Sequence, residues 1–266
     1  MAPTTRSQTR RARPDALIKL LRTGRHHYDH TYTEGLNVCP QPWDSGDCTS
    51  GGLYACELRH IFVWWIHLYP DITEVAWVDV PADAHVARFD TKIKASALVL
   101  TGVMPIAEAI RLAIQAGADV HAYNDYALRW ASLNGHLAVV EVLVKVADIH
   151  ADDDYALRFA SFYGHLSVVE FLVKVGANVH AADDAALRFA SSSGHLAVVE
   201  FLVKAGADVH ADDDEALRYA SSYGHLPIVK VLVKAGANVH AVDDQALLWA
   251  SERGHLPVVE FIKSLP

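Results

Sequence analysis

The second half of the chain consists of near-identical segments repeated at a fixed spacing. Three copies of 30 residues lie in strict register at 151–180, 181–210 and 211–240. A 29-residue copy precedes them at 122–150, and a truncated copy follows at 241–266. A fixed period between about 20 and 50 residues indicates a solenoid, in which each unit buries its apolar face only against its neighbours. Nothing in the repeated segment is typical of a reactive centre, so the pattern favours binding over catalysis.

One repeat predicts two short helices. In the copy at 151–180, residues 155–162 are expected to form a first helix with small apolar residues on one face. Residues 167–174 are expected to form a second helix, because valine and leucine recur there at amphipathic spacing. Asp152, Asp153 and Asp154 form a polar turn before the first helix, and the sequence predicts that Asp154 caps it.

The repeat resembles that of the ankyrin family. The segment GHLSVVEFLVKVGANVHA at 164–181 resembles the second half of an ankyrin repeat, and YALRFAS at 155–161 resembles the first half. The family repeat is about 33 residues long, and shorter repeats of the present kind resemble those in giant DNA virus arrays. The resemblance covers residues 103–266. It implies a mainly α solenoid of helix-turn-helix units over 101–266, opening with a half-repeat at 101–121.

Histidine, arginine and aspartate recur at fixed positions of the repeat. Ten histidines are periodic, one set before the turn and one after the mid-repeat glycine: His121, His150, His180, His210, His240, His136, His165, His195, His225 and His255. Each set should form a ladder with rungs about 10 Å apart, whereas metal ligands lie about 2 Å from a shared ion. We therefore expect structural histidines, no metal and no cofactor.

The repeated arginines and aspartates have two interpretations. Arg129, Arg158, Arg188 and Arg218 are expected to hydrogen-bond between adjacent turns. The aspartates form an acidic edge, which the sequence explains as caps and solvated turns or as a docking edge for a basic partner.

Residues that differ between otherwise identical copies are candidates for recognition. In ankyrin arrays, the resemblance implies, such first-helix positions line a concave face that grips a partner protein. Exposed aromatic residues are typical of interface cores. The sequence thus predicts a non-enzymatic protein–protein interaction module whose partner-binding residues are Tyr126, Leu133, Asn134, Tyr155, Phe162, Tyr163, Glu215, Tyr223, Glu252 and Arg253.

The first hundred residues contain no repeat. Residues 1–14 hold four arginines and no acid, which indicates a disordered basic arm. Residues 15–100 have mixed patterning and are expected to form a small α/β domain. Its expected elements are helices at 15–22 and 56–69 and strands at 72–80, 84–89 and 95–100.

Two resemblances concern this front segment. Residues 26–55 resemble the domain that precedes ankyrin arrays in giant-virus proteins, a resemblance that implies no activity. A histidine followed by Tyr-x-x-Gly-Leu and Gly-Gly-Leu-Tyr resembles the ADP-ribosyltransferase fold. The residues that would hold nicotinamide dinucleotide are then His27, Tyr32, Gly52 and Tyr54, although no glutamate suited to catalysis follows. An active transferase, and a structural or virion component that self-associates through the Phe261 end, are the alternative functions.

Composition limits the location and the partners of the protein. No apolar run reaches the roughly 18 residues that a membrane-spanning helix needs, and no secretory signal is evident. Three cysteines, an odd number, indicate reduced thiols. We therefore expect an intracellular, cytoplasmic protein, in the host cytoplasm if the chain is viral. The net charge of −9 disfavours nucleic acid as a partner, apart from the basic arm.

Overall fold

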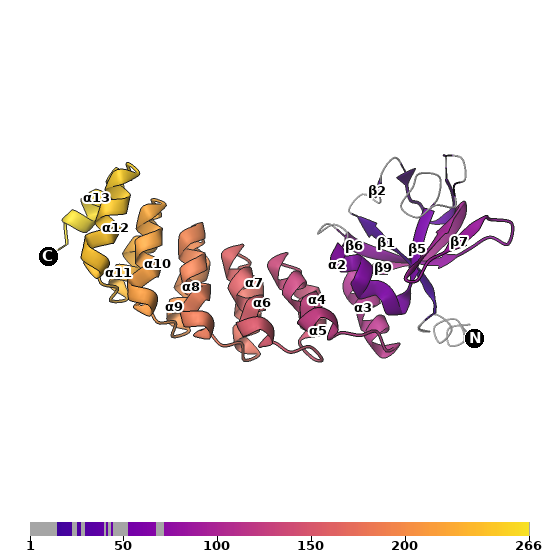
Figure 1. Cartoon of the computed structure of the whole chain (residues 1–266), viewed down its shortest axis with the longest axis horizontal. Helices are drawn as coiled ribbons and strands as arrows, with labels where there is room; N and C mark the ends of the chain where they lie inside the picture. The colour runs from indigo at the N-terminus through magenta and orange to yellow at the C-terminus, as the bar shows by residue number, and fades with distance from the viewer. Residues whose placement is uncertain are drawn as a thin grey trace, which may run out of the picture. The chain divides into compact units, whose positions relative to one another are not determined.

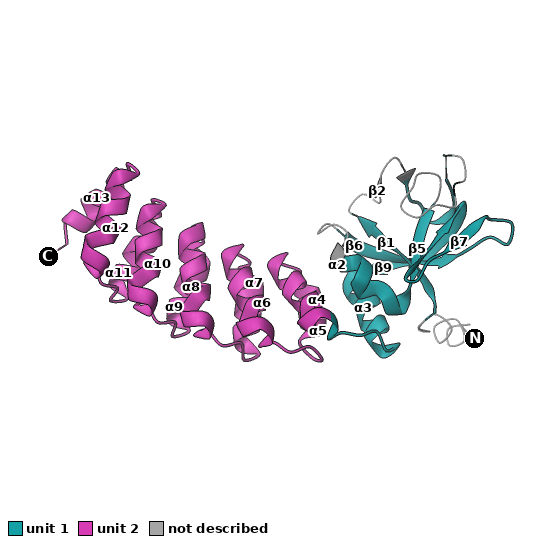
Figure 2. Cartoon of the chain, in the orientation of Figure 1, with its two compact units in different colours: residues 1–122 teal, residues 123–266 magenta. Residues whose placement is uncertain are grey.

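The computed structural model divides the chain into two compact units, residues 1–122 and residues 123–266 (Figure 2). It describes residues 15–22, 26–27, 30–39, 41, 44, 53–67 and 72–265. The predicted basic arm at 1–14 lies outside the described residues. In the described part, no helix combines the length and the apolar character needed to cross a bilayer.

Unit 1 is built on a seven-stranded sheet with the order β4-β9-β6-β1-β5-β8-β7. Every pairing between neighbours is antiparallel. The strands are β1 (Leu17–Arg22), β4 (Gly35–Val38), β5 (Leu53–Glu57), β6 (Ile72–Asp79), β7 (Val86–Arg88), β8 (Lys92–Ala95) and β9 (Ala97–Pro105). Strands β2 (His26–His27) and β3 (His30–Thr31) form a separate pair. One face of the large sheet carries a core that includes Leu21, Ala55 and Leu98.

Short helices accompany this sheet. A single 3-10 turn, η2 (Leu58–His60), leads into α2 (Ile61–His67), which packs near β5. Helix α3 (Ile106–Gln115) follows β9 and packs against β6 and β9. The half-repeat expected at 101–121 thus begins as a strand, and its helix is grouped with unit 1.

The helix predicted at 15–22 is wrong, because these residues form the central strand β1. Its register places Ile18 opposite Cys56 of β5 and Trp77 of β6, so pairing on both sides determines its conformation. Such non-local pairing commonly overrides local propensity. The helix predicted at 56–69 is shorter than expected, whereas the strand predicted at 72–80 is confirmed as β6.

Unit 2 is an array of five helix pairs, which confirms the mainly α repeat fold (Figure 1). The first helices are α4 (Ala122–Leu133), α6 (Ala151–Phe162), α8 (Ala181–Ser193), α10 (Ala211–Ser222) and α12 (Ala241–Glu252). The second helices are α5 (Leu137–Leu143), α7 (Leu166–Lys174), α9 (Leu196–Lys204), α11 (Leu226–Lys234) and α13 (Leu256–Lys263). From α6 onward, first helices pack on first helices, and second helices pack on second helices.

A continuous apolar core runs through the array. In the repeat at 151–180, Leu157, Ala160, Val168 and Leu172 are all fully buried, and their counterparts in the next two repeats are buried equally. Alanine at the position of Ala160 lets successive first helices approach closely. The helix pairs therefore share one hydrophobic spine, as the sequence predicts for a solenoid.

Candidate interaction surface

Each first helix begins with a single left-handed turn of three residues. In α6 these are Asp152, Asp153 and Asp154, with φ of 55°, 51° and 53°. This region of φ and ψ disfavours most L-residues but is visited by asparagine and aspartate. Of the fifteen non-glycine residues with positive φ in the described part of the chain, eleven are aspartate and one is asparagine. The left-handed turn thus explains the acidic triplets of the sequence.

The last aspartate of the turn ties the start of its repeat to the loop that ends the same repeat. The buried carboxylate of Asp154 accepts a hydrogen bond from the backbone N–H of Asn178, 2.9 Å away, and faces Nδ1 of His150 at 3.2 Å. The predicted cap by Asp154 is wrong, because a capping residue has extended backbone whereas Asp154 is left-handed. The same bond within a repeat recurs from the backbone N–H of Asp208 to Asp184 at 2.8 Å and from that of Asn238 to Asp214 at 2.7 Å.

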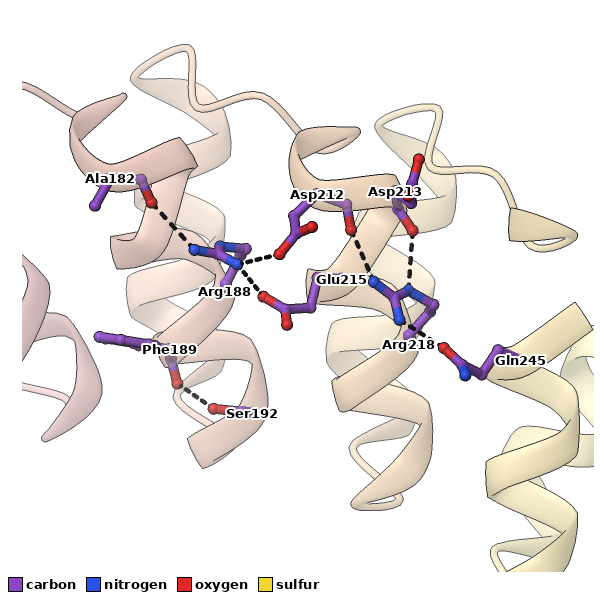
Figure 3. A network of polar contacts seen from close by, with 9 residues as sticks. All are labelled: Ala182, Arg188, Phe189, Ser192, Asp212, Asp213, Glu215, Arg218 and Gln245. Atoms are coloured by element: carbon purple, nitrogen blue, oxygen red, sulfur yellow. Dashed lines mark hydrogen bonds and ion pairs between the residues drawn. The ribbon is translucent and has the colours of Figure 1, made fainter. Parts of the chain in front are cut away.

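The repeated arginines donate hydrogen bonds to backbone carbonyls of the turn. Arg158 donates from Nε to the carbonyl of Asp153 at 2.8 Å and from Nη2 to that of Asp152 at 2.7 Å. Arg129 and Arg188 additionally reach a carboxylate in the next turn, Asp152 at 2.9 Å and Asp212 at 2.7 Å. The predicted hydrogen bonding between adjacent turns is thereby confirmed for Arg129 and Arg188, and Arg218 reaches Gln245 of the next repeat. Figure 3 shows this network around Arg188 and Arg218.

The residue that follows the turn meets the arginine of the preceding repeat. Tyr155 lies with its ring centre 5.1 Å from the guanidinium of Arg129. At the equivalent position, Glu215 forms an ion pair with Arg188 (Figure 3), and the proximity of this carboxylate raises the pKa of Tyr219. The first residue after the turn therefore contacts the arginine of the preceding repeat both where it is aromatic, as Tyr155, and where it is acidic, as Glu215. The carboxylate of Glu215, predicted to bind a partner protein, is engaged within the array.

Aromatic rings form two clusters along the first helices. In the first, Tyr155 stacks on Phe159 with centroids 3.9 Å apart, and Phe162 packs edge-on against Tyr163 at 5.0 Å and Phe189 at 5.9 Å. Phe162 and Tyr163 remain 37% and 49% exposed.

The second cluster joins Tyr219 to Trp249 at 5.9 Å and to Tyr223 at 6.3 Å, and Tyr223 is 48% exposed. We call the surface formed by the first helices and the residue after each the first-helix face. Its rings are Tyr126, Trp130, Tyr155, Phe159, Phe162, Tyr163, Phe189, Tyr219, Tyr223 and Trp249.

The remaining predicted residues lie at the two ends of the array. Tyr126 lies under the guanidinium of Arg129 at 5.2 Å, and the side-chain amide of Asn134 donates to the carbonyl of Trp130. Leu133 is half-buried, and its carbonyl accepts a bond from the next repeat. In the last repeat Glu252 is exposed, and the guanidinium of Arg253 lies 5.0 Å from the ring centre of Tyr223.

The sequence did not indicate Tyr123, which is 71% exposed in the left-handed turn of the first repeat. The available signal was an aromatic residue at a position that is aspartate in two other repeats and a small or branched apolar residue in the remaining two.

The mid-repeat histidines connect neighbouring repeats. Nε2 of His165 lies 2.9 Å from the carbonyl oxygen of Leu133, and Nε2 of His195 lies 2.9 Å from that of Phe162. The expected structural role of this ladder is confirmed at these positions. Among the side chains that the structure describes, no three His, Cys, Asp or Glu gather as metal ligands would.

The two described residues of the nicotinamide hypothesis do not lie together. Tyr32 is buried in the core on one face of the unit 1 sheet, with Leu53 and Ala55. Side chains alternate along a strand, so Tyr54 points to the opposite face, where its ring centre is 4.8 Å from Nζ of Lys92. Burial raises the pKa of Tyr32. Gly52 and the side chain of His27 lie outside the described residues.

Comparisons with known proteins agree on the array. The family model described as ankyrin repeats in three copies matches residues 105–183, 128–213 and 187–265. An ankyrin repeat protein of Acanthamoeba polyphaga mimivirus, a giant virus, is 32% identical over 128 residues, and the match covers 43% of this chain and 40% of that protein. The chain thus spans less than half the length of the relative that it matches.

Proposed function

Because the chain belongs to the ankyrin repeat family, we propose that it is a non-enzymatic protein that recognises another protein through its first-helix face. Ankyrin repeats are generally protein–protein interaction modules, and proteins of the family are typically not enzymes. The observation that carries the proposal is the exposure of three aromatic rings, Phe162, Tyr163 and Tyr223, on the first-helix face. Exposed aromatic side chains of this kind are typical hot spots of interfaces.

The proposed contact residues are those that differ between repeats on this face. They are Tyr126, Leu133, Asn134, Tyr155, Phe162, Tyr163, Glu215, Tyr223, Glu252 and Arg253. Similarity to a giant-virus protein favours a host protein as the partner. An intracellular setting is part of the proposal, and the free thiols of Cys39 and Cys56 support it.

The test replaces Phe162, Tyr163 and Tyr223 together by serine in the full chain. Capture of protein partners from a host-cell lysate should be abolished, while helicity by circular dichroism stays nearly unchanged because these rings are half exposed.

The control replaces Val146, Val175 and Leu256 by serine, since these side chains are similarly exposed but follow or belong to second helices. Capture that survives in the triple-ring variant, or is lost equally in the control, contradicts the proposal.

A further inference from the structure

The repeat array carries almost all of the negative charge of the chain. Residues 123–266 hold 19 Asp and Glu against 11 Lys and Arg, which is −8 of the net charge of −9. Much of it lies in the left-handed turns that open the first helices. The middle residue of each turn is exposed and, in four of the five, is an aspartate: Asp153, Asp183, Asp213 and Asp243.

These middle carboxylates differ from their neighbours in the same turns. The first aspartate is paired in two turns, Asp152 with Arg129 and Asp212 with Arg188. The middle aspartates have no cationic side chain within 4.0 Å among the described residues. They recur once per repeat, about 10 Å apart, which is comparable to the Debye length at physiological salt. Salt at this concentration screens much of the field between them, so their potentials add along the array most strongly at low salt.

Arginine side chains of the array itself already lie over rings of the first-helix face. Arg129 lies between the rings of Tyr126 and Tyr155, at 5.2 and 5.1 Å from their centres. Arg253 covers one side of Tyr223 at 5.0 Å. An arginine over an aromatic face is a stabilising cation–π arrangement. This surface is thus built of rings that stack on arginine.

The exposed rings Phe162 and Tyr163 have no such cover. No Lys or Arg of the described part of the chain lies over either ring, and both are more than a third exposed. They continue the cluster that begins at Tyr155, through Phe159.

The carboxylate row and the ring cluster are contiguous. The guanidinium of Arg158 donates to the backbone of Asp153 and lies 5.7 Å from the ring centre of Tyr155. One arginine side chain therefore separates the turn from Tyr155, and the cluster continues along α6 to Phe162 and Tyr163 at the other end of the helix. A ligand that extends along the first-helix face would meet negative charge at the turns and exposed rings about 12 Å further along the helices.

We infer that the first-helix face docks an extended, arginine-rich segment of the partner protein. Its guanidinium groups pair with the middle aspartates and contact the exposed parts of the Tyr163 and Tyr223 rings. Arginine suits both roles, because its planar fork binds carboxylates and stacks on rings, which the lysine ammonium does less well. This inference rests on the proposed function and names the chemistry of the partner.

The test measures binding of labelled peptides to the full chain by fluorescence anisotropy. The probe is a peptide of three Arg-Leu-Arg-Gly copies, compared with the same peptide carrying lysine or glutamate in place of arginine. We expect binding in the order arginine, lysine, glutamate, and a loss of affinity of about tenfold or more on raising the salt from low to high. Equal binding of the glutamate peptide overturns the inference.

The decisive variant replaces Asp153, Asp183, Asp213 and Asp243 by asparagine. The fold should tolerate it, since Asn124 already occupies the same turn position with φ of 59°. Removing four charges should weaken binding of the arginine peptide by about tenfold or more, because the modest contributions of four exposed ion pairs are lost together.

The matched control removes the same number of charges from the second helices by replacing Glu141, Glu170, Glu200 and Glu260 with glutamine; all four are exposed. The control should bind the arginine peptide nearly as tightly as the unmodified chain. An equal effect of the two variants means that net charge alone acts, and this too overturns the inference.

Failure of the inference can be told apart from failure of the proposed function. If a lysate partner is lost with the three ring substitutions but is retained in the asparagine variant and at high salt, the face binds protein without using basic residues. The proposed function then stands and the arginine-rich partner does not.

Discussion

The imidazole of His255 lies directly over the backbone of Gly224 in the preceding repeat. A β-carbon at Gly224 would come within 2.5 Å of the imidazole Nδ1. The same arrangement places His165 over Gly135, His195 over Gly164 and His225 over Gly194. Each Gly-His dipeptide therefore takes part in two contacts between repeats. Its glycine leaves room for the histidine of the next repeat, and its histidine packs on the glycine of the preceding repeat.

Replacement of Gly224 by alanine should destabilise the contact between the last two repeats. Both Gly224, with φ of +75°, and Gly254, with φ of +74°, are left-handed, so alanine costs about 1 kcal/mol at either position. Only at Gly224 does the new methyl group meet His255, which should add about 1–3 kcal/mol of overpacking. Urea unfolding of Gly224→Ala and Gly254→Ala measures the difference. Equal losses would show that the histidine moves aside freely.

Replacement of Asp214 by alanine should loosen the junction with the loop at Asn238. The backbone N–H of Asn238 then loses a charged acceptor 2.7 Å away. Loss of such a bond costs about 2–3 kcal/mol. The matched control is Asp213→Ala, in which alanine takes the same left-handed backbone but no buried bond is removed. Hydrogen exchange of the Asn238 amide should accelerate in the first variant only; unchanged protection there would contradict the role of Asp214.

Replacement of Leu248 by arginine should stabilise the last repeat. Leu248 is 51% exposed and occupies the position of Arg218, whose guanidinium binds the carbonyls of Asp212 and Asp213. The introduced arginine can reach the equivalent carbonyls of the turn before it, which should contribute about 1 kcal/mol. Slower hydrogen exchange in α12 is the expected result. Leu248→Lys, which lacks the two-pronged donor, should give a smaller gain, and an equal gain would point to charge rather than geometry.

Replacement of Lys19 by methionine should stabilise unit 1 in a pH-dependent way. Burial lowers the pKa of Lys19 from 10.5 to about 8. Between these values the unfolded chain binds more protons than the folded one, so the stability of the unmodified protein rises as the pH increases through this window. Below pH 8 the penalty is complete, up to about 3 kcal/mol. The gain from Lys19→Met should therefore be largest at pH 7 and shrink towards pH 10.5, as followed by urea unfolding; a gain independent of pH excludes the charge as its cause.

The periodic part of the sequence predicts most of the array because its information is local. Valine and leucine spacing within one repeat is enough to place Val168 and Leu172 in the spine and to identify both helices. The Asp152–Asp154 turn was misassigned because aspartate suits both a helix cap and a left-handed backbone. The deciding partner, the N–H of Asn178, lies 24 residues further along the chain, in the loop that ends the same repeat.

Non-local partners also account for the other errors. The segment Leu17–Arg22 is a strand because β5 and β6 pair with it, although neither is near it in the sequence. At the candidate surface, sequence differences between repeats indicated the variable positions of the first helices. They did not reveal that Glu215 faces Arg188, since the side chain opposite belongs to another copy.

The His-to-carbonyl and His-to-glycine contacts between repeats have a consequence for how such an array changes over generations. Every repeat offers the same carbonyl and glycine to the repeat that follows and the same histidine to the repeat that precedes. A duplicated or deleted 30-residue block can therefore pack against its new neighbours without any new residue at the junction. Recombination between copies can therefore lengthen or shorten the array in whole steps. Each step moves the two ring clusters apart or together by one helix spacing, which changes the span of ligand that can be gripped while every single repeat stays as it was.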